Sequence, residues 1–207
     1  MYADPELVPL LRSIRPEVNK MTLNIGIGST LIASYTDDGI PYLWKSGDIT
    51  TPHSNETKIT ASDGAATDFF GRSVAVGSGR IVVGAYGDDD NGSNSGSAYI
   101  FDLDGNQLAK ITASDGAASD SFGISVAVGF GRIVVGARLD DDNGTDSGSA
   151  YIFDLDGNQL SKITASDGAA DDLFGISVAV GSGRIVVGAN QDDDNGTSSG
   201  SAYIFDL

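Results

Sequence analysis

The chain has 207 residues, enough to bury one substantial core, and its formal net charge is −17 with a sequence pI near 4.1. A surface this acidic repels phosphate backbones and anionic lipids, which argues against nucleic-acid binding and membrane-surface binding. No cysteine is present, so disulfides and thiolate metal sites are excluded, and no run approaches the roughly 18 apolar residues of a membrane span.

The first element, residues 1–21, is interpreted as a closing strand or a docking segment. A helix over residues 4–15 is the alternative, with Asp4 as N-cap and Pro5 in the first turn. Pro9 argues against the helix, because it would remove a backbone hydrogen bond at a cost of ~3 kcal/mol. The segment also lacks the basic start and the apolar core of a secretory signal, so none is expected.

Residues 22–62 are interpreted as a degenerate copy of a unit that recurs later in the chain. Leu23–Trp44 can be laid over Val74–Phe101 with the glycines in register, but its acidic loop is shorter. This region is therefore predicted to form a first, less regular copy of the repeated structure.

The sequence then repeats with a period of 52 residues, marked by Lys58, Lys110 and Lys162. Each copy offers four strand-like runs between Gly- and Asp-rich turns, in the middle copy Ser125–Val128, Arg132–Ala137, Ser149–Leu155 and Gln159–Ala165. Four short strands in about 50 residues are typical of a propeller blade. We therefore predict an all-β protein, a β-propeller of about four four-stranded blades at about residues 22–62, 69–113, 121–165 and 173–207.

The last copy ends at Leu207 without its fourth strand, which would leave sheet edges unpaired. Leu11–Ile14 matches Leu160–Ile163 position for position, and it precedes the first blade as that strand precedes the next. The N-terminal segment is therefore predicted to pair with the last blade and close the ring. If it is a helix instead, we expect it to anchor the protein to a partner.

Phe122-Gly123, followed by Gly136-Ala137 and then by SGSAYIFD, resembles the FG-GAP repeat, the blade unit of integrin α-subunit propellers and of many bacterial and phage surface proteins. The same pairs recur in the neighbouring copies, at Phe70-Gly71, Gly84-Ala85, Phe174-Gly175 and Gly188-Ala189. The resemblance covers residues 58–207 strongly and 22–57 weakly. It implies a propeller fold, and it leaves the function open.

The integrin repeat carries a calcium cage between its Phe-Gly and Gly-Ala pairs, but here that loop is as short as Gly129–Arg132 and holds no carboxylate. Carboxylates instead follow the second strand of each copy, in Asp-Asp-Asp-Asn-Gly runs. Calcium takes about six to eight oxygen ligands, and alternating aspartates with an asparagine can supply several of them. The predicted calcium ligands are Asp88, Asp90, Asn91, Asp140, Asp142, Asn143, Asp192, Asp194 and Asn195.

A plain turn is the alternative for these runs, because Asn-Gly tolerates positive φ and aspartate side chains form Asx turns that keep an edge soluble. In a four-stranded meander, the loop between strands two and three opens on the same face as the crossover after strand four. Asp63, Asp115 and Asp167 of the crossovers are therefore expected beside the Asp runs, on one concentrated acidic face.

The copies differ from one another mainly on this expected face. Tyr86, Arg138 and Asn190 occupy equal positions just after the Gly-Ala pairs, and we predict that they contact a ligand. Unselected drift of exposed loops is the alternative explanation.

No catalytic constellation is apparent, so we expect no enzyme activity and no catalytic residues. His53 is the only histidine, which leaves a catalytic triad without support. The Asp run recurs in three copies, whereas an active site needs one asymmetric arrangement of groups.

Two functions follow from these observations. The first is a non-enzymatic binding or adhesion module on an exposed surface, with calcium as a stabilising ion and a protein or glycan on a cell or particle surface as its partner. The alternative is a structural virion component, such as a phage fibre, neck or capsid-decorating protein, docked through its N-terminal segment. The absence of a recognisable signal favours the second, and homo-oligomerisation is compatible with both.

Overall fold

The computed structural model describes residues 31–35, 41–45 and 56–207. The chain divides into two units, residues 1–56 and 57–207. In the first unit, β1 (Leu31–Tyr35) and β2 (Pro41–Lys45) form an antiparallel hairpin with Ile32 opposite Trp44. The closing strand predicted in residues 1–21 lies outside the described residues, and the assignment of residues 22–62 to a first blade stays a prediction.

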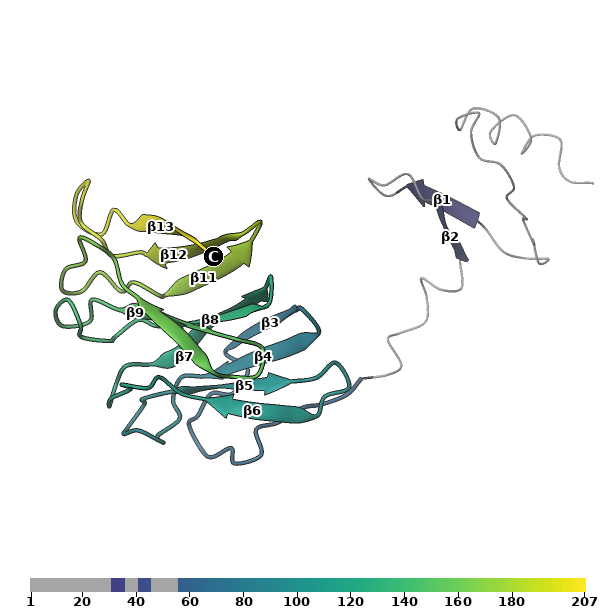
Figure 1. Ribbon diagram of the computed structural model, residues 1–207, viewed down its shortest axis with the longest axis horizontal. Helices are drawn as coiled ribbons and strands as arrows, with labels where there is room; N and C mark the ends of the chain where they lie inside the picture. Colours follow the sequence, from purple (N-terminus) through teal and green to yellow (C-terminus); the bar gives the residue numbers. More distant parts are fainter. Residues whose placement is uncertain (1–30, 36–40, 46–55) are drawn as a thin grey trace, which may run out of the picture. The chain divides into compact units, whose positions relative to one another are not determined.

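The second unit consists of three antiparallel sheets, each a meander in chain order (Figure 1). The β3 sheet contains β3 (Ser73–Gly77), β4 (Arg80–Ala85), β5 (Ser97–Phe101) and β6 (Gln107–Ile111). The β7 sheet contains β7 (Phe122–Gly129), β8 (Arg132–Ala137), β9 (Ser149–Phe153) and β10 (Gln159–Ile163). The β11 sheet has three strands, β11 (Ser177–Gly181), β12 (Arg184–Ala189) and β13 (Ser201–Asp206).

Tight turns fix the register of these meanders. The connection between β3 and β4 places Ser78 at φ 49° and Gly79 at φ 73°, the conformation of a two-residue hairpin turn that matches strand twist. Between β5 and β6, the Asp102 carboxylate accepts hydrogen bonds from the backbone and side-chain amides of Asn106, both at 2.8 Å. The repeated turn chemistry therefore gives each sheet the same pairing.

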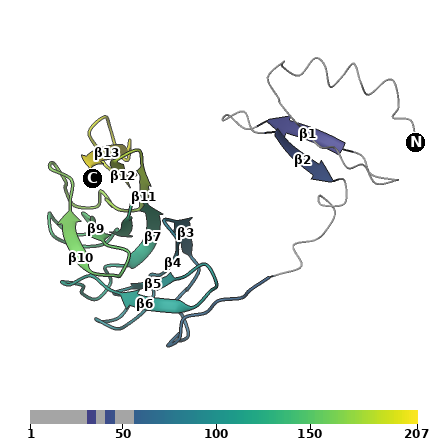
Figure 2. The same ribbon diagram turned by 45° about the vertical axis from the view of Figure 1, so that its right-hand side comes forward.

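The core lies between consecutive sheets, which pack face to face so that β7 contacts both β3 and β11 (Figure 2). Phe122 is fully buried and packs edge to face against Tyr151 and Phe153, with ring centroids 5.4 and 5.9 Å away. The facing side of the β3 sheet contributes Val82 and Ile100, also fully buried. The rings of Phe122, Tyr151 and Phe153 thus fill the space between the β3 and β7 sheets.

Phe-Gly and Gly-Ala pairs form the joint between neighbouring sheets. A Cβ added to Gly84 would overlap the carbonyl oxygen of Gly123, so only glycine permits this close approach. The Ser73 hydroxyl donates to the same carbonyl at 2.8 Å, and Gly96 forms a parallel bridge with Phe122. The next joint repeats this geometry with Gly136, Gly175, Ser125, Gly148 and Phe174.

Consecutive antiparallel meanders stacked in this way are blades of a β-propeller, and the predicted all-β fold is confirmed. Two described blades have four strands and the last has three. No helix of the described residues is long and apolar enough to cross a membrane.

Candidate binding face

The loops that were predicted to share one face do meet. The loop between β4 and β5 accepts hydrogen bonds from the crossover that leads to β7: Ser93 and Asn94 carbonyls receive the amides of Ser119 and Ser121 at 2.8 and 3.1 Å. The next pair of loops repeats these bonds. The acidic face is therefore a continuous band of loops joined through their backbones.

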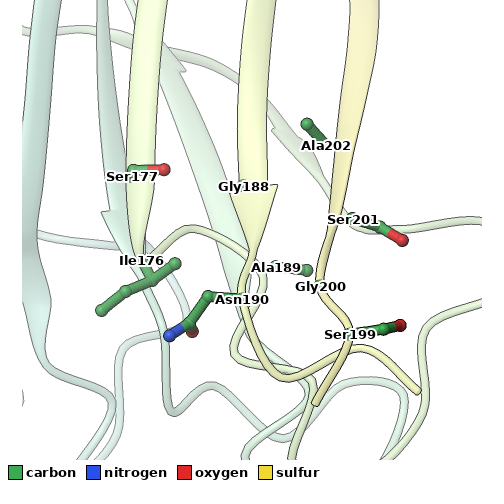
Figure 3. A pocket seen from close by; sticks show the side chains of 9 residues that line it. All are labelled: Ile176, Ser177, Gly188, Ala189, Asn190, Ser199, Gly200, Ser201 and Ala202. Carbon is green, nitrogen blue, oxygen red and sulfur yellow. The ribbon is translucent and has the colours of Figure 1, made fainter. Parts of the chain in front are cut away.

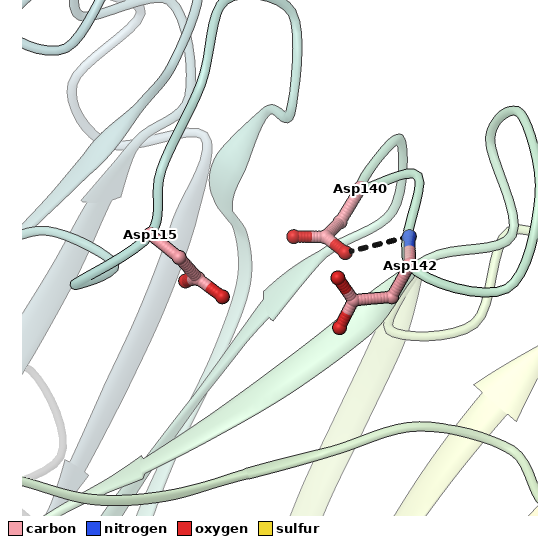
Figure 4. Close-up of side chains that lie close together, drawn as sticks. All are labelled: Asp115, Asp140 and Asp142. Carbon is pink, nitrogen blue, oxygen red and sulfur yellow. Dashed lines mark hydrogen bonds between the residues drawn. The ribbon is translucent and has the colours of Figure 1, made fainter.

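Three carboxylates of the β7 sheet and its crossover, those of Asp115, Asp140 and Asp142, converge on this face (Figure 4). The Lys162 ammonium lies 2.8 Å from Asp115, 3.0 Å from Asp140 and 2.6 Å from Asp142. The Asp140 side chain is only 6% exposed, whereas those of Asp115 and Asp142 are about half exposed. The lysine thus neutralises a buried carboxylate together with two that remain in contact with water.

A tyrosine completes this cluster. The Tyr151 hydroxyl lies 2.9 Å from Asp115 and 2.8 Å from Asp140, so it donates to one carboxylate at a time. The Lys162 ammonium also lies 5.2 Å from the centre of the Tyr151 ring, within the range of a cation–π contact. The β3 sheet has an equivalent cluster, formed by Lys110, Tyr99, Asp63, Asp88 and Asp90.

The charges within each cluster stabilise one another. Burial alone would favour neutral Lys162, but hydrogen bonds to three carboxylates raise the pKa of its ammonium above the ordinary value. Burial likewise acts to raise the pKa of Asp115, but the Lys162 and Tyr151 hydrogen bonds lower it overall. Burial raises the pKa of Tyr151 and neighbouring Asp140 raises it further, which keeps the phenol protonated as a donor.

The β11 sheet carries the same carboxylates without an ammonium among the described residues. The Asp192 carboxylate accepts hydrogen bonds from Tyr203 at 2.8 Å and from Ser201 at 3.0 Å. The backbone amide of Asp194, followed by the Tyr203 hydroxyl, lowers the pKa of Asp192. The repeat equivalents of Lys110 and Lys162 would lie in a fourth strand, which this three-stranded sheet does not contain.

The three groups of predicted calcium ligands therefore differ in how well they could hold a divalent ion. In the β3 and β7 clusters, the aspartates do converge, but an ammonium already lies among them. Asn143 points its side-chain amide elsewhere, donating to the Ala165 carbonyl at 3.1 Å. In the β11 sheet, the partners of the Asp192 carboxylate are Ser201, Tyr203 and the backbone amide of Asp194, and no ammonium lies beside it among the described residues.

The predicted ligand contacts follow the second strand of each blade but have different surroundings. Tyr86 is half-buried and stacks on Phe69, with ring centroids 5.0 Å apart. Arg138 is half-buried, and its buried Nε has no hydrogen-bond partner among the described residues. Asn190 is exposed and lines a pocket of about 500 Å³ on the β11 sheet (Figure 3).

Sequence reasoning missed the lysines and tyrosines of the clusters. Lys110 and Lys162 were interpreted only as markers of the period, although a signal was present: in a chain with 29 acidic and 12 basic residues, a lysine follows each of the first two Asp-Asp-Asp runs. Lys162 follows Asp142 by 20 residues, so the proximity of the two side chains depends on the pairing of β9 with β10, which places Lys162 opposite Tyr151.

Comparison with known proteins identifies the repeat. The family described as FG-GAP repeat matches residues 53–101, 106–153 and 158–205, more than half of the chain. The second match runs from the fourth strand of the β3 sheet to the third strand of the β7 sheet, and the third match is placed in the same way. No curated protein sequence matches the chain.

Proposed function

The chain belongs to the FG-GAP repeat family, and from this premise we propose that it is a non-enzymatic β-propeller module that binds a protein or glycan through its acidic face. The proposal places the module on an exposed surface, outside a cell or on a particle. Proteins with the same fold have many different functions, so the function of this one depends on the residues of its acidic face.

The loops of the acidic face have the same structure in each blade, but the side chains that follow the Gly-Ala pairs differ. The carboxylate–lysine clusters and the backbone bonds between loops recur almost unchanged, so they hold the loops in equivalent positions. On this scaffold Tyr86, Arg138 and Asn190 differ in shape, charge and hydrogen-bonding capacity. Rigid loops that present dissimilar side chains are typical of binding surfaces.

Replacing Tyr86, Arg138 and Asn190 together by alanine is expected to weaken ligand binding by about tenfold or more, because the contacts of all three blades are truncated. The probes are a glycan array and a panel of immobilised basic proteins, with the unchanged protein as reference.

The matched control is the triple alanine variant at Ser78, Phe130 and Ser182. These residues also occupy equal positions in three blades, in the turns between the first two strands at the other end of the meanders. Equal binding by the face variant and the unchanged protein would remove the proposal, whereas loss with the control variant alone would move the binding surface to the opposite face.

We propose calcium stabilisation for the β11 sheet, where Asp167, Asp192 and Asp194 hold the positions of the β7 cluster aspartates and have no lysine beside them among the described residues. If the site has the affinity of extracellular calcium modules, about 10⁻⁴ M, then about 10 mM calcium should stabilise dilute protein by about 2.7 kcal/mol. Urea unfolding with calcium and with chelator measures this difference.

The Asp194→Asn variant should lose the calcium effect, because it removes one of the three proposed carboxylate ligands. The Asp142→Asn variant alters the equivalent position beside Lys162 and should retain it. An unfolding midpoint that calcium leaves unchanged in the unaltered protein would contradict the calcium proposal.

A structural virion component is the second candidate. The supporting feature is that both outer faces of the described stack carry exposed apolar side chains, including Val74 and Val76 at one end and Ile204 at the other. Such patches are common where a protein joins an assembly. Recovery of the protein only within particles would favour this role over adhesion, whereas a lone soluble protein that binds glycans or cells would favour adhesion.

A further inference from the structure

The β11 sheet ends in an open edge. In the other two sheets a fourth strand pairs with the third, as Ile111 does with Ala98 and Lys110 with Tyr99. In the β11 sheet, β13 forms the edge, and Ala202 and Tyr203 occupy the positions of Ala98 and Tyr99. This strand therefore presents free backbone groups on one side, among the residues that the structure describes.

The outer face of the same sheet contains an open socket. Figure 3 shows the pocket that Ser177, Gly188, Ser199 and Gly200 help to line. The equivalent glycines Gly84 and Gly136 touch the Phe-Gly pair of the following sheet, but around Gly188 the only close atoms belong to its own sheet. The socket therefore contains the positions that a Phe-Gly pair covers in the other two sheets, and no described residue covers them here.

The loop beside the socket also lacks its usual partners. The carbonyls of Thr145, Asp146 and Ser147 accept the amides of Asp171, Leu173 and Phe174 at 2.8, 3.2 and 2.9 Å. In the β11 sheet the corresponding carbonyls belong to Thr197, Ser198 and Ser199. None of these three receives a backbone hydrogen bond from the described residues.

The opposite end of the stack carries the complementary segment. Residues 58–71 read KITASDGAATDFFG, nearly the sequence of residues 110–123 and 162–175, which form the fourth strand and the Phe-Gly joint. Ile59 and Ala61 pack on the aromatic side of the β3 sheet, as Ile111 and Ala113 do on the β7 sheet. Yet residues 56–61 are not in a strand, because no third strand of a preceding sheet lies beside them among the described residues.

The apolar faces at the two ends match as well. Val74 is 68% exposed, whereas its equivalent Val126 is 9% exposed against the preceding sheet. Ile204 is 70% exposed, whereas its equivalent Ile100 is fully buried against the following sheet. The joint that buries these positions is made twice within the chain, so the two outer faces are already complementary.

We propose that a second copy of the chain fills the open edge, with its residues Lys58–Gly71 acting as the fourth strand and the Phe-Gly joint of the β11 sheet. Lys58 of that copy would bring its ammonium to Asp167, Asp192 and Asp194, so it would replace the calcium ion proposed for these carboxylates in the separate chain. Association is head to tail, so it closes into a ring or continues as a stack.

Sequence favours a second copy over the chain's own first 55 residues as the occupant. Those residues contain no phenylalanine and therefore no Phe-Gly pair. In Leu11–Ile14, the position of the cluster lysine is held by Ser13. Residues 58–71 offer the lysine, the strand and the joint together, and the two other segments that do so are already paired within the β3 and β7 sheets.

The test uses the full chain and measures its mass in solution over a concentration series. The unchanged protein is expected to exceed the 21.2 kDa of one chain. Ile204→Lys blocks one end and Val74→Lys the other, so each should weaken self-association by about tenfold or more. Leu160→Lys is the matched control, because this exposed leucine lies on β10 and its equivalent Leu108 is equally exposed within the stack.

Mixing distinguishes a head-to-tail contact from a symmetric one. Ile204→Lys protein retains a working Lys58–Gly71 segment, and Val74→Lys protein retains a working β11 sheet, so an equimolar mixture should form a two-chain complex. A symmetric interface would leave the mixture as weakly associated as its components, and this result would overturn the proposal. A mass of one chain for the unchanged protein at every concentration would overturn it too.

Cross-linking identifies the strand pair directly. The double variant Ile59→Cys and Ala202→Cys introduces the only cysteines, at positions equivalent to the paired Ile111 and Ala98. Oxidation should give disulfide-linked species of two or more chains. An exclusively intrachain disulfide, or none, would show that residues 58–71 do not join a second copy.

Discussion

Replacing Gly136 by alanine is expected to destabilise the protein by about 3 kcal/mol, the upper range for overpacking a core. Its Cβ would overlap the backbone carbonyl of Gly175, in the Phe-Gly pair that leads into the next sheet. A backbone group cannot rotate away as a side chain can, so relief requires separation of the β7 and β11 sheets. Urea unfolding, followed by far-UV circular dichroism of the strands, measures the change in the unfolding midpoint. The dependence of the unfolding free energy on urea concentration should stay constant.

The chain supplies its own control at Gly188, which lies in an identical RIVVGA strand. The close atom there is the Ser177 hydroxyl, which can rotate, so Gly188→Ala should cost less than about 1 kcal/mol in dilute protein. The same substitution should weaken self-association, because its Cβ would meet Gly71 of a second copy. Equal destabilisation by the two alanines would mean that the joint is not what restricts Gly136.

Replacing Lys162 by methionine should destabilise the protein by about 3 kcal/mol, because it leaves Asp140 buried and charged without a counter-ion. The half-exposed Asp115 and Asp142 contribute less, since water screens them. Methionine retains the length and apolar stem of lysine, so the loss is electrostatic. The measurement is again the free energy of unfolding from urea titration.

The double variant Lys162→Met and Asp140→Asn separates the charge effect from packing. Removing the buried carboxylate charge should recover a large part of the lost stability, as expected when both partners of a buried pair are neutralised. The Asp140→Asn variant alone gives the cost of that substitution when Lys162 is present. If the double variant were less stable than Lys162→Met by this same cost, Asp140 would not be the group that Lys162 stabilises.

Much of the fold could be predicted from local patterns. The run Arg132–Ala137 forms β8 with the bounds that the sequence predicts, and the Phe-Gly and Gly-Ala pairs by themselves indicate propeller blades. The predicted run Ser149–Leu155 extends past β9, which ends at Phe153, because Asp154 begins the turn by pairing with Asn158. The residue at which a strand ends depends on such hydrogen bonds in the turn, and the pattern of apolar residues does not predict them.

The candidate site was only partly visible in sequence. The Asp runs and the crossover aspartates were expected on one face, and the backbone bonds between their loops place them there. The lysine among them was not anticipated, because Lys162 follows Asp140 by 22 residues and reaches it only across the third strand. A carboxylate cluster that sequence interpreted as a cation site or a plain turn is, in two blades, an internal ion-pair network.

The sequence by itself determined the repeat, the all-β class and the order of strands within each blade, because turn residues and alternating apolar positions act over a few neighbouring residues. The tertiary structure decided what neutralises each Asp cluster and which faces stay open. Those outcomes depend on groups brought together across sheets: Lys162 beside Asp140, Gly136 against Gly175, and Gly188 facing the socket. Near-identical repeats thus acquire different chemistry from their place in the stack.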